Sequence, residues 1–252
     1  MTEKIFLSVV VPAYNEEKRI VKPLERIARY LECQPYTSEI IVVDDGSIDQ
    51  TGPVVLNQLK GVERGILLQN NRNRGKGYSV RQGILASQGQ YVLFSDADLS
   101  TPIEEVAKLL QVVQGDYDIA IGSRGLKRSD VRVHQPWYRE YMGKTFNLIL
   151  RLLGLSQFHD TQCGFKCFRG DVARELFALQ TLDHYSFDVE ILMLAQMHRY
   201  RILEVPVRWV NEPNSRVDAI TDSARMLIDV IKIRHNMRTG KYAETTNRQK
   251  AY

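Results

Sequence analysis

Two aspartates separated by one residue are the first candidates for chemistry in this sequence of 252 residues. Residues 91–102 read Y-V-L-F-S-D-A-D-L-S-T-P, so four residues that suit a buried strand, 91–94, run into Ser95 and then Asp96 and Asp98. Carboxylates at this spacing offer hard oxygen ligands to Mg²⁺ or Mn²⁺ beside a substrate diphosphate. Because aspartate is also a common turn former, the pair taken alone fits either a metal site or a plain turn.

Short apolar runs alternate with stretches of helical periodicity in the first half of the chain. Strands are expected at residues 7–11, 39–43, 65–68 and 91–94, and helices at 16–31, 54–59 and 78–87. We expect Pro12 to end the first strand. This alternation predicts an α/β fold with a mostly parallel central sheet flanked by helices. The carboxyl ends of such strands meet at one edge, where ligands bind.

The polar residues that follow these strands should therefore gather at one edge, although they are far apart in sequence. Acidic groups there can hold a base, a ribose and a metal ion, and a lysine between two glycines can approach a diphosphate. Each residue alone also fits a turn or a solvated loop, but together they predict a nucleotide-sugar pocket. The set comprises Tyr14, Asn15, Glu16, Asp44, Asp45, Lys76, Asp96 and Asp98.

Two common nucleotide-binding motifs are missing from the sequence. No G-x-G-x-x-G opens the first predicted helix, and no G-x-x-x-x-G-K-[ST] occurs. Their absence argues against dinucleotide oxidoreductases and P-loop nucleotide hydrolases.

Composition narrows the class of protein further. The net charge of +4 suits phosphate groups or an anionic surface but falls short of a nucleic-acid-binding signature, so we expect no nucleic-acid partner. The cysteines, Cys33, Cys163 and Cys167, are too few for a disulfide framework, which favours a reducing compartment. No apolar run is long enough to span a membrane, so we expect any membrane contact to be peripheral.

Four motifs resemble family 2 glycosyltransferases of the GT-A fold in their order and spacing. They are V-V-V-P-A-Y-N-E-E at 9–17, V-V-D-D-G-S at 42–47, N-R-G-K-G at 73–77 and D-A-D at 96–98. D-T-Q-C-G-F-K-C-F at 160–168 and F-D-V-E at 187–190 resemble the branch that contains dolichyl-phosphate glucosyltransferases and mannosyltransferases. The resemblance implies an inverting transfer of a hexose from UDP or GDP to a polyprenyl phosphate, and the 160–168 segment favours UDP-glucose.

The resemblance also implies roles for individual residues of the donor site. Asp45 would contact the base, Lys76 would face the diphosphate, and Asp96 would serve both the ribose and the metal. Mannosyl-transferring relatives often carry glutamine where this chain has Ser100, so only Asp96 and Asp98 are expected as protein ligands of Mg²⁺ or Mn²⁺. The nucleoside site would be lined by Pro12, Ala13, Tyr14 and Glu16.

Basic residues follow a predicted strand at 119–121 and suit the acceptor side. Arg124 and Arg139 are the preferred catalytic phosphate ligands, because a guanidinium group binds phosphate in bidentate fashion. A solvated basic loop is the alternative interpretation of this stretch. Gln162 is expected to line the same pocket.

Asp188 and Glu190 fall in the first turn of a helix predicted at 187–197. Negative charge is favourable there in any helix, whereas the resemblance places one or both residues at the acceptor. A phosphate acceptor is already ionised near neutral pH and needs no strong base. A hydroxyl acceptor needs one, and Asp188 is then the expected base.

The sequence therefore predicts a metal-dependent hexosyltransferase with a lipid-phosphate acceptor, peripheral at the cytoplasmic face of a membrane. We expect a single domain at 1–240, with a nucleotide-sugar half at 1–122, an acceptor half at 123–240 and a polar tail at 241–252. A basic amphipathic helix at 220–237 fits either packing on the domain or lying on an anionic membrane. The alternatives are a family 2 transferase acting on a glycan or small-molecule hydroxyl, a GDP-mannose-using mannosyltransferase, and an inactive nucleotide-sugar binding module.

Overall fold

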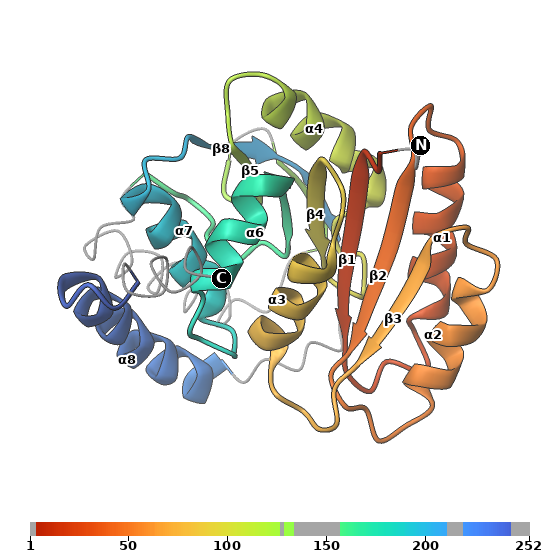
Figure 1. Ribbon diagram of the computed structural model, residues 1–252, viewed down its shortest axis with the longest axis horizontal. Coiled ribbons are helices and arrows are strands. Elements are labelled where there is room, and N and C mark those ends of the chain that lie inside the picture. The colour runs from red at the N-terminus through yellow and green to blue at the C-terminus, as the bar shows by residue number, and fades with distance from the viewer. Residues whose placement is uncertain (1–3, 127–128, 134–156, 211–218, 243–252) are drawn as a thin grey trace.

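A seven-stranded mixed sheet forms the centre of the computed structural model, which describes residues 4–126, 129–133, 157–210 and 219–242 (Figure 1). The strand order is β3-β2-β1-β4-β7-β5-β8. Neighbouring strands pair in parallel except at β7, which is antiparallel to both β4 and β5. The strands are β1 (Leu7–Ala13), β2 (Ser38–Asp44), β3 (Gly65–Gln69), β4 (Tyr91–Ser95), β5 (Ile119–Ser123), β7 (Phe165–Arg169) and β8 (Ile202–Pro206).

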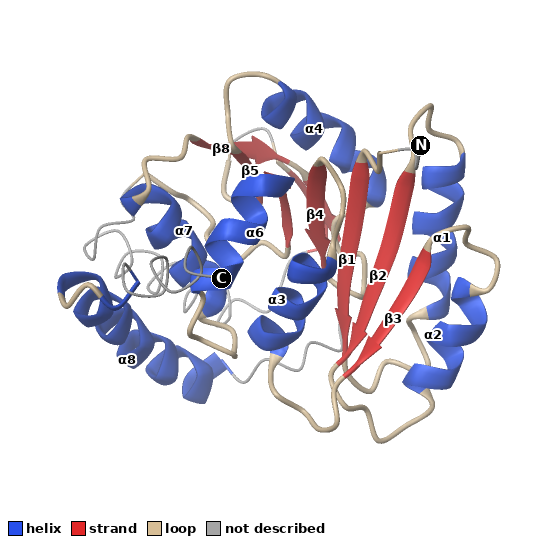
Figure 2. Ribbon diagram, viewed as in Figure 1, coloured by secondary structure: helices blue, strands red, loops and turns tan. Residues whose placement is uncertain are grey.

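Helices cover both faces of this sheet (Figure 2). Because both faces are buried, apolar residues run continuously through the central strands instead of alternating with polar ones, as at residues 40–43 of β2 and 91–94 of β4. In β1, Val9 and Val11 pack in one hydrophobic cluster and Val10 packs in the other. The helices are α1 (Val21–Glu32), α2 (Thr51–Leu59), α3 (Lys76–Ala86), α4 (Val106–Gln114), α6 (Gly170–Leu179), α7 (Phe187–Met197) and α8 (Ala219–Arg238).

Smaller elements complete the described part of the chain. A 3₁₀ turn, η1 (Ile103–Glu105), precedes α4. β6 (Asp130–Val133) and β9 (Arg208–Val210) pair in parallel as a separate two-stranded sheet. Among the described residues, no helix combines the length and the apolar character that a membrane span needs.

The first strand runs two residues further than the sequence indicates. The expectation that Pro12 ends it is wrong, because β1 pairs with β2 through Ala13. The carbonyl of Ala13 accepts a hydrogen bond from the backbone N–H of Asp45 on the β2 side, so Pro12 faces the β4 side. Pairing with β4 has already ended at Val10, so no ladder hydrogen bond is lost there.

The central sheet combines strands from both halves of the chain. β7 comes late in the sequence but lies between β4 and β5, next to the strand that carries Asp96 at its end. In the register of β4 and β7, Ser95 pairs with Phe165 and Phe94 pairs with Lys166. This insertion brings residues 163–166 to the edge where the polar ends of the parallel strands meet.

Candidate active site

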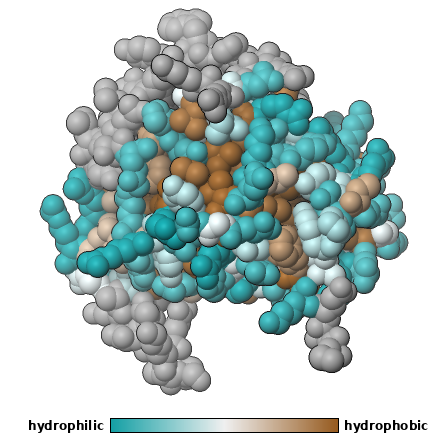
Figure 3. Space-filling view, turned by 90° about the horizontal axis from the view of Figure 1, so that it is seen from above, coloured by the Kyte–Doolittle hydropathy of each residue, from teal (hydrophilic) through white to brown (hydrophobic). Residues whose placement is uncertain are grey.

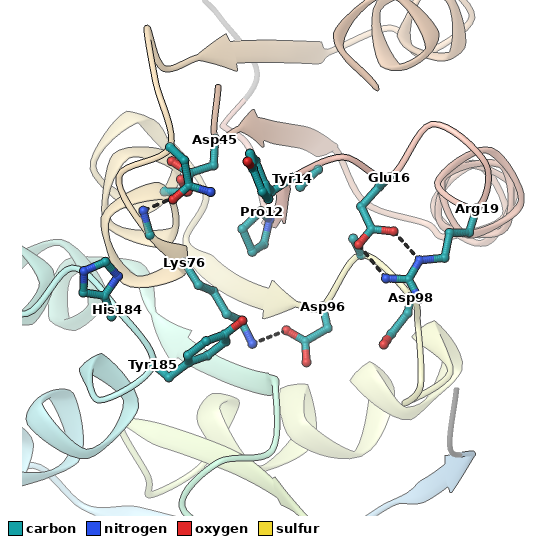
Figure 4. A pocket seen from close by; sticks show the side chains of 15 residues that line it. Pro12, Tyr14, Glu16, Arg19, Asp45, Lys76, Asp96, Asp98, His184 and Tyr185 are labelled. Carbon is teal, nitrogen blue, oxygen red and sulfur yellow. Dashed lines mark hydrogen bonds and ion pairs between the residues drawn. The ribbon is translucent and has the colours of Figure 1, made fainter. Parts of the chain in front are cut away.

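A cavity of about 290 Å³ opens at the carboxyl ends of β1, β2 and β4 (Figure 4). Its walls come from segments far apart in sequence, as the parallel topology predicts. Of the residues expected at the donor site, Asn15 and Asp44 are missing from its lining. The lining residues are Pro12, Ala13, Tyr14, Glu16, Arg19, Asp45, Asn73, Gly75, Lys76, Ser79, Asp96, Ala97, Asp98, His184 and Tyr185.

The loop after β1 is held against the loop that precedes α2. Asn15 has a positive φ of 52° and links the two loops in both directions. Its backbone N–H donates to Ser47 Oγ at 2.8 Å, and its Oδ1 accepts from the backbone N–H of Ile48 at 2.9 Å. The N–H of Glu16 also donates to Thr51 Oγ1 at 2.6 Å. These bonds keep residues 12–16 at the cavity wall.

The carboxylate of Glu16 is bound within the cavity wall by a neighbouring cation. Arg19 Nη2 donates to Glu16 Oε1 at 2.7 Å, and Arg19 Nε contacts Oε2. Figure 4 shows this pair on the same side of the cavity as Asp98. The pair gives that wall both an acceptor and a donor for a polar ligand.

Asp45 organises the glycine-containing loop that leads into α3. Its Oδ1 accepts from Asn70 Nδ2 at 2.7 Å and from the backbone N–H of Arg74 at 3.0 Å, and its Oδ2 accepts from that of Gly75 at 2.8 Å. Gly75 has a φ of 107°, and a Cβ there would meet His184 Nδ1 at 2.5 Å, so only glycine fits. Asp45 thus sets the position of the loop as well as lining the cavity.

Asp44 serves the turn after β2 instead of the cavity. Its Oδ1 accepts from the backbone N–H of Ser47 at 3.0 Å, and its Oδ2 accepts from Gln69 Nε2 at 3.2 Å. The side chain is buried. The structure therefore places Asp44 beside the predicted pocket but outside its lining.

Lys76 and Asp96 form an ion pair in the cavity. Lys76 is the first residue of α3, and its Nζ lies 2.6 Å from Asp96 Oδ1 (Figure 4). Burial alone would lower the pKa of Lys76, but the nearby charges of Asp96 and Asp188 raise it above the usual value. The amine is therefore a permanent cation at the positive end of a helix, which suits a diphosphate ligand.

The two carboxylates of the D-x-D motif fit a divalent cation in their donor chemistry. Asp98 Oδ1 accepts from the backbone N–H of Ser100 at 2.9 Å. Burial and then the charge of Asp96 raise the pKa of Asp98, so a cation between the two carboxylates would relieve their repulsion. The described residues hold no cluster of three or more His, Cys, Asp or Glu around one point. Mg²⁺ commonly uses one or two carboxylates and completes its shell with substrate phosphates and water.

Asp188 belongs to a second, buried ion pair behind the cavity. Lys166 Nζ donates to Asp188 Oδ1 at 2.5 Å and to the carbonyl of Cys163 at 2.7 Å. Burial raises the pKa of Asp188, and the charges of Lys166 and Lys76 oppose that effect. Asp188 does not line the cavity, although its charge acts on Lys76.

Glu190 lies in the core, away from the cavity. Its carboxylate accepts from the backbone N–H of Thr181 at 3.0 Å and from Thr181 Oγ1 at 2.6 Å. It also accepts from the N–H of Leu182 at 2.9 Å and from the hydroxyl of Tyr242 at 2.8 Å. The side chain is fully buried, so these bonds give Glu190 a structural task in holding the 181–182 segment.

Arg124 and Gln162, which were predicted for the acceptor side, do not line this cavity. Asp160 accepts from Arg124 Nε at 2.6 Å and from Arg124 Nη2 at 2.8 Å, which fixes the guanidinium orientation. Burial alone would raise the pKa of Asp160, but the charge of Arg124 and its hydrogen bonds lower the pKa below its ordinary value. Gln162 Nε2 contacts Met226 Sδ at 3.3 Å. Arg139 lies outside the described residues.

Sequence reasoning missed several lining residues, above all two from the second half of the chain. His184 and Tyr185 reach the cavity because the 180–186 segment packs on the first turn of α3. Gln180 Nε2 donates to the carbonyl of Gly77 at 2.9 Å, and a Cβ at Gly77 would lie 2.8 Å from the carbonyl oxygens of Leu182 and His184. The second glycine of the G-K-G motif was the signal for this close approach. Arg19, Asn73 and Ser79 were also missed.

Known proteins resemble this chain over most of its length. A model of glycosyl transferase family 2 matches residues 8–177, which confirms the kinship that the motifs predicted. The dolichyl-phosphate beta-glucosyltransferase of Dictyostelium discoideum is 36% identical over 92% of this chain and 75% of the relative. The dolichyl-phosphate beta-glucosyltransferase of Homo sapiens is 34% identical over 94% of this chain and 77% of the relative.

Solved structures share the fold. Glucosyl-3-phosphoglycerate synthase from Mycobacterium tuberculosis, in complex with Mn²⁺ and uridine-diphosphate-glucose, has a TM-score of 0.68 at 19% sequence identity. The match covers 90% of this chain and 78% of that chain. This likeness confirms the GT-A fold expected from the motifs.

Proposed function

This chain belongs to glycosyl transferase family 2, and we propose that it transfers glucose from UDP-glucose to a polyprenyl or dolichyl phosphate. The relatives named dolichyl-phosphate beta-glucosyltransferase support this pair of substrates. The observation that carries the proposal is the cavity in which Lys76, at the N-terminus of α3, faces Asp96 and Asp98. Residues 1–240 act as one catalytic domain, because strands from both halves share the central sheet.

The donor half of the cavity suits a nucleotide diphosphate. Pro12, Tyr14 and Asp45 lie together on one side of the cavity (Figure 4), where they would bind the nucleoside. The N-terminus of α3 and Lys76 would hold the diphosphate by their positive charge. A divalent cation bound by Asp96 and Asp98 would neutralise charge on the departing diphosphate.

Transfer to a phosphate acceptor depends more on the alignment of donor and acceptor than on removal of a proton from the acceptor. A phosphate acceptor is ionised near neutral pH, so its oxygen attacks the anomeric carbon without a general base. The buried pair with Lys166 favours an orienting role for Asp188, since the carboxylate already accepts a hydrogen bond from Lys166 Nζ at 2.5 Å. Arg124, oriented by Asp160, and Arg139 would bind the acceptor phosphate.

The outer face of α8 supports a peripheral position on a membrane. Ile228 and Ile231 are 66% and 59% exposed, while Met226, Val230 and Ile233 on the other face are buried. Helical spacing puts the exposed Lys232, His235 and Arg238 on the same stripe as the two exposed isoleucines. A stripe that is apolar and basic suits the surface of an anionic bilayer. α8 and the carboxyl ends of β1–β3 lie on the same, lower side of Figure 1.

The opposite edge of the molecule faces away from the proposed membrane. Figure 3 shows this side with hydrophilic side chains around hydrophobic ones near the middle of the view. An orientation with α8 toward the lipid would bring the cavity toward a lipid-phosphate acceptor. The cytoplasmic face is the proposed location, and the free thiols of Cys33, Cys163 and Cys167 support a reducing compartment.

Hexose transfer from radiolabelled UDP- and GDP-sugars to a short polyprenyl phosphate in detergent tests the function. We expect glucose from UDP-glucose to enter the organic phase with Mg²⁺ or Mn²⁺ and to stay in the aqueous phase with EDTA. If product forms from GDP-mannose alone, the donor is GDP-mannose instead of UDP-glucose. Slow hydrolysis of the donor without any lipid product would contradict the lipid-phosphate acceptor and point to a hydroxyl acceptor. A folded Asp98→Ala variant is expected to lose turnover.

A further inference from the structure

Two lysine–aspartate pairs lie beside the same aromatic ring in the active site. Lys76 Nζ is 5.3 Å and Lys166 Nζ is 6.0 Å from the ring centroid of Phe94. Lys76 pairs with Asp96 at 2.6 Å, and Lys166 pairs with Asp188 at 2.5 Å. The pairs have the same chemistry, so their difference in burial is informative.

One pair is built into the core and the other faces the cavity. The side chains of Lys166 and Asp188 are 2% and 6% exposed, and Lys166 is further fixed by the carbonyl of Cys163. The side chains of Lys76 and Asp96 are 24% and 32% exposed and both line the cavity. The Lys166 pair is therefore a structural contact, whereas the Lys76 pair can exchange partners without disturbing the core.

The Lys76 ammonium competes with a divalent cation for Asp96. The ammonium contacts Oδ1 of the carboxylate that, with Asp98, is the proposed protein ligand of the metal. A dication on the same carboxylate would lie within a few ångströms of the ammonium, and the two positive charges would repel strongly in this poorly solvated place.

We propose that Lys76 is a latch that occupies Asp96 until the diphosphate of the donor draws the ammonium away. The diphosphate supplies the new anionic partner, and Asp96 then becomes available to the cation. Metal and nucleotide should consequently bind together, each strengthening the other. This inference rests on the proposed donor and metal sites, but it does not depend on the sugar or on the acceptor.

The backbone around Lys76 favours movement of the side chain alone. Asp45 and the 180–186 segment hold the loop and the first turn of α3 through Gly75 N, Gly77 O and Tyr78 N. The long side chain can swing from Asp96 to a diphosphate while its Cα stays in place. The charge of Asp188 also attracts the ammonium, so Lys76 remains close to the reaction centre after it leaves Asp96.

Binding of Mn²⁺, measured by electron paramagnetic resonance without any sugar or acceptor, tests the latch. In the absence of nucleotide, we expect Lys76→Met to bind Mn²⁺ about tenfold more tightly than the wild type. Lys76→Arg keeps the positive charge and should bind Mn²⁺ as weakly as the wild type. UDP should tighten Mn²⁺ binding to the wild type by a larger factor than in Lys76→Met. By linkage, Mn²⁺ should tighten UDP binding to each protein by the same factor, which calorimetry can measure.

Two control variants separate the latch from a general effect of charge. Arg74→Met removes one positive charge from the same loop, where Arg74 stacks on Tyr78 at 3.9 Å and makes no ion pair with Asp96. Lys108→Met breaks a comparable pair with Glu105, and neither of these residues lines the cavity. Both should leave Mn²⁺ affinity within about twofold of the wild type.

An equal gain in Mn²⁺ affinity in Arg74→Met and Lys76→Met would overturn the latch. It would show that the loss of any positive charge near the cavity strengthens Mn²⁺ binding. Unchanged Mn²⁺ affinity in a folded Lys76→Met protein would overturn it as well, as would a lack of Mn²⁺ binding to any variant in the presence of UDP. Failure of glucose transfer to lipid would leave these binding results intact. The latch and the proposed acceptor can therefore fail separately.

Discussion

Gly164 lies directly against the carboxylate of Asp96. The backbone N–H of Asp96 donates to the carbonyl of Gly164 at 3.0 Å, and a Cβ built on Gly164 would collide with both carboxylate oxygens. The residue that precedes β7 therefore shapes the end of β4, although the two are far apart in sequence. A glycine here is required by the space that Asp96 occupies, with no need for an unusual φ.

Gly164→Ala should displace the Asp96 carboxylate from its place in the cavity. Because a misplacement of about 1 Å at a reacting centre costs about 100-fold, we expect a loss of transfer activity of that order. The measurement is initial rate of glucose transfer together with the melting temperature. Gly61→Ala is the matched control, since a Cβ at Gly61 meets nothing within 4 Å. Full activity in Gly164→Ala would show that Asp96 tolerates the shift.

The two lysine–aspartate pairs should differ sharply in their effect on stability. Lys166→Met leaves the buried Asp188 without its cation, and we expect the free energy of unfolding to fall by about 3–5 kcal/mol. Lys76→Met breaks the pair that faces the cavity, where we expect a change of about 1 kcal/mol or less. Urea denaturation of both variants at neutral pH makes the comparison. Equal losses would contradict the structural role assigned to the Lys166 pair.

The Arg124–Asp160 pair should contribute to stability in a pH-dependent way. The pKa of Asp160 is lower in the folded protein than its ordinary value, because Arg124 outweighs the effect of burial. Its contribution is therefore fully present above the unfolded value of about 3.9 and is lost as the pH falls through the folded value. Asp160→Asn should cost about 3–5 kcal/mol at pH 7.

Unfolding by urea at a series of pH values checks this sign. The stability gap between the wild type and Asp160→Asn should stay constant between about pH 7 and pH 5 and narrow below about pH 4. A gap that widens on acidification would refute the assigned direction. Asp171→Asn is the control, because Asp171 is exposed and pairs with the exposed Arg169 at 3.3 Å.

The exposed isoleucines of α8 should matter for binding to vesicles but not for chemistry in detergent. We expect Ile228→Ser with Ile231→Ser to weaken co-sedimentation with anionic vesicles by about 100-fold, because burial of two isoleucine side chains in the bilayer surface contributes about 3 kcal/mol. Leu56→Ser, on α2, is the control and should change little, although Leu56 is 55% exposed. Transfer to a short polyprenyl phosphate in detergent should be unaffected. Unchanged vesicle binding in the double variant would remove α8 from the membrane contact.

Local patterns in the sequence were enough to predict the order of the first strands and helices and the edge where the donor site lies. Apolar runs and helical spacing depend on neighbouring residues, and parallel topology then brings the ends of the strands together. Asp45, Lys76, Asp96 and Asp98 were located in this way, and all of them line the cavity.

The sequence did not show which way each side chain points or which residues it contacts, and the tertiary structure was needed for both. Asp44 and Asp45 are adjacent, yet one holds a turn and the other lines the cavity, because successive residues of an extended chain point to opposite sides. Asp188 and Glu190 are two positions apart on one helix and also face different surroundings.

The contributions of the second half of the chain were decided by long-range packing. β7 lies antiparallel between β4 and β5, which brings Gly164 and Lys166 to Asp96 and Asp188. The 180–186 segment packs on α3 and adds His184 and Tyr185 to the cavity. No local periodicity encodes these contacts, because their stability comes from surfaces that meet only after the sheet has assembled.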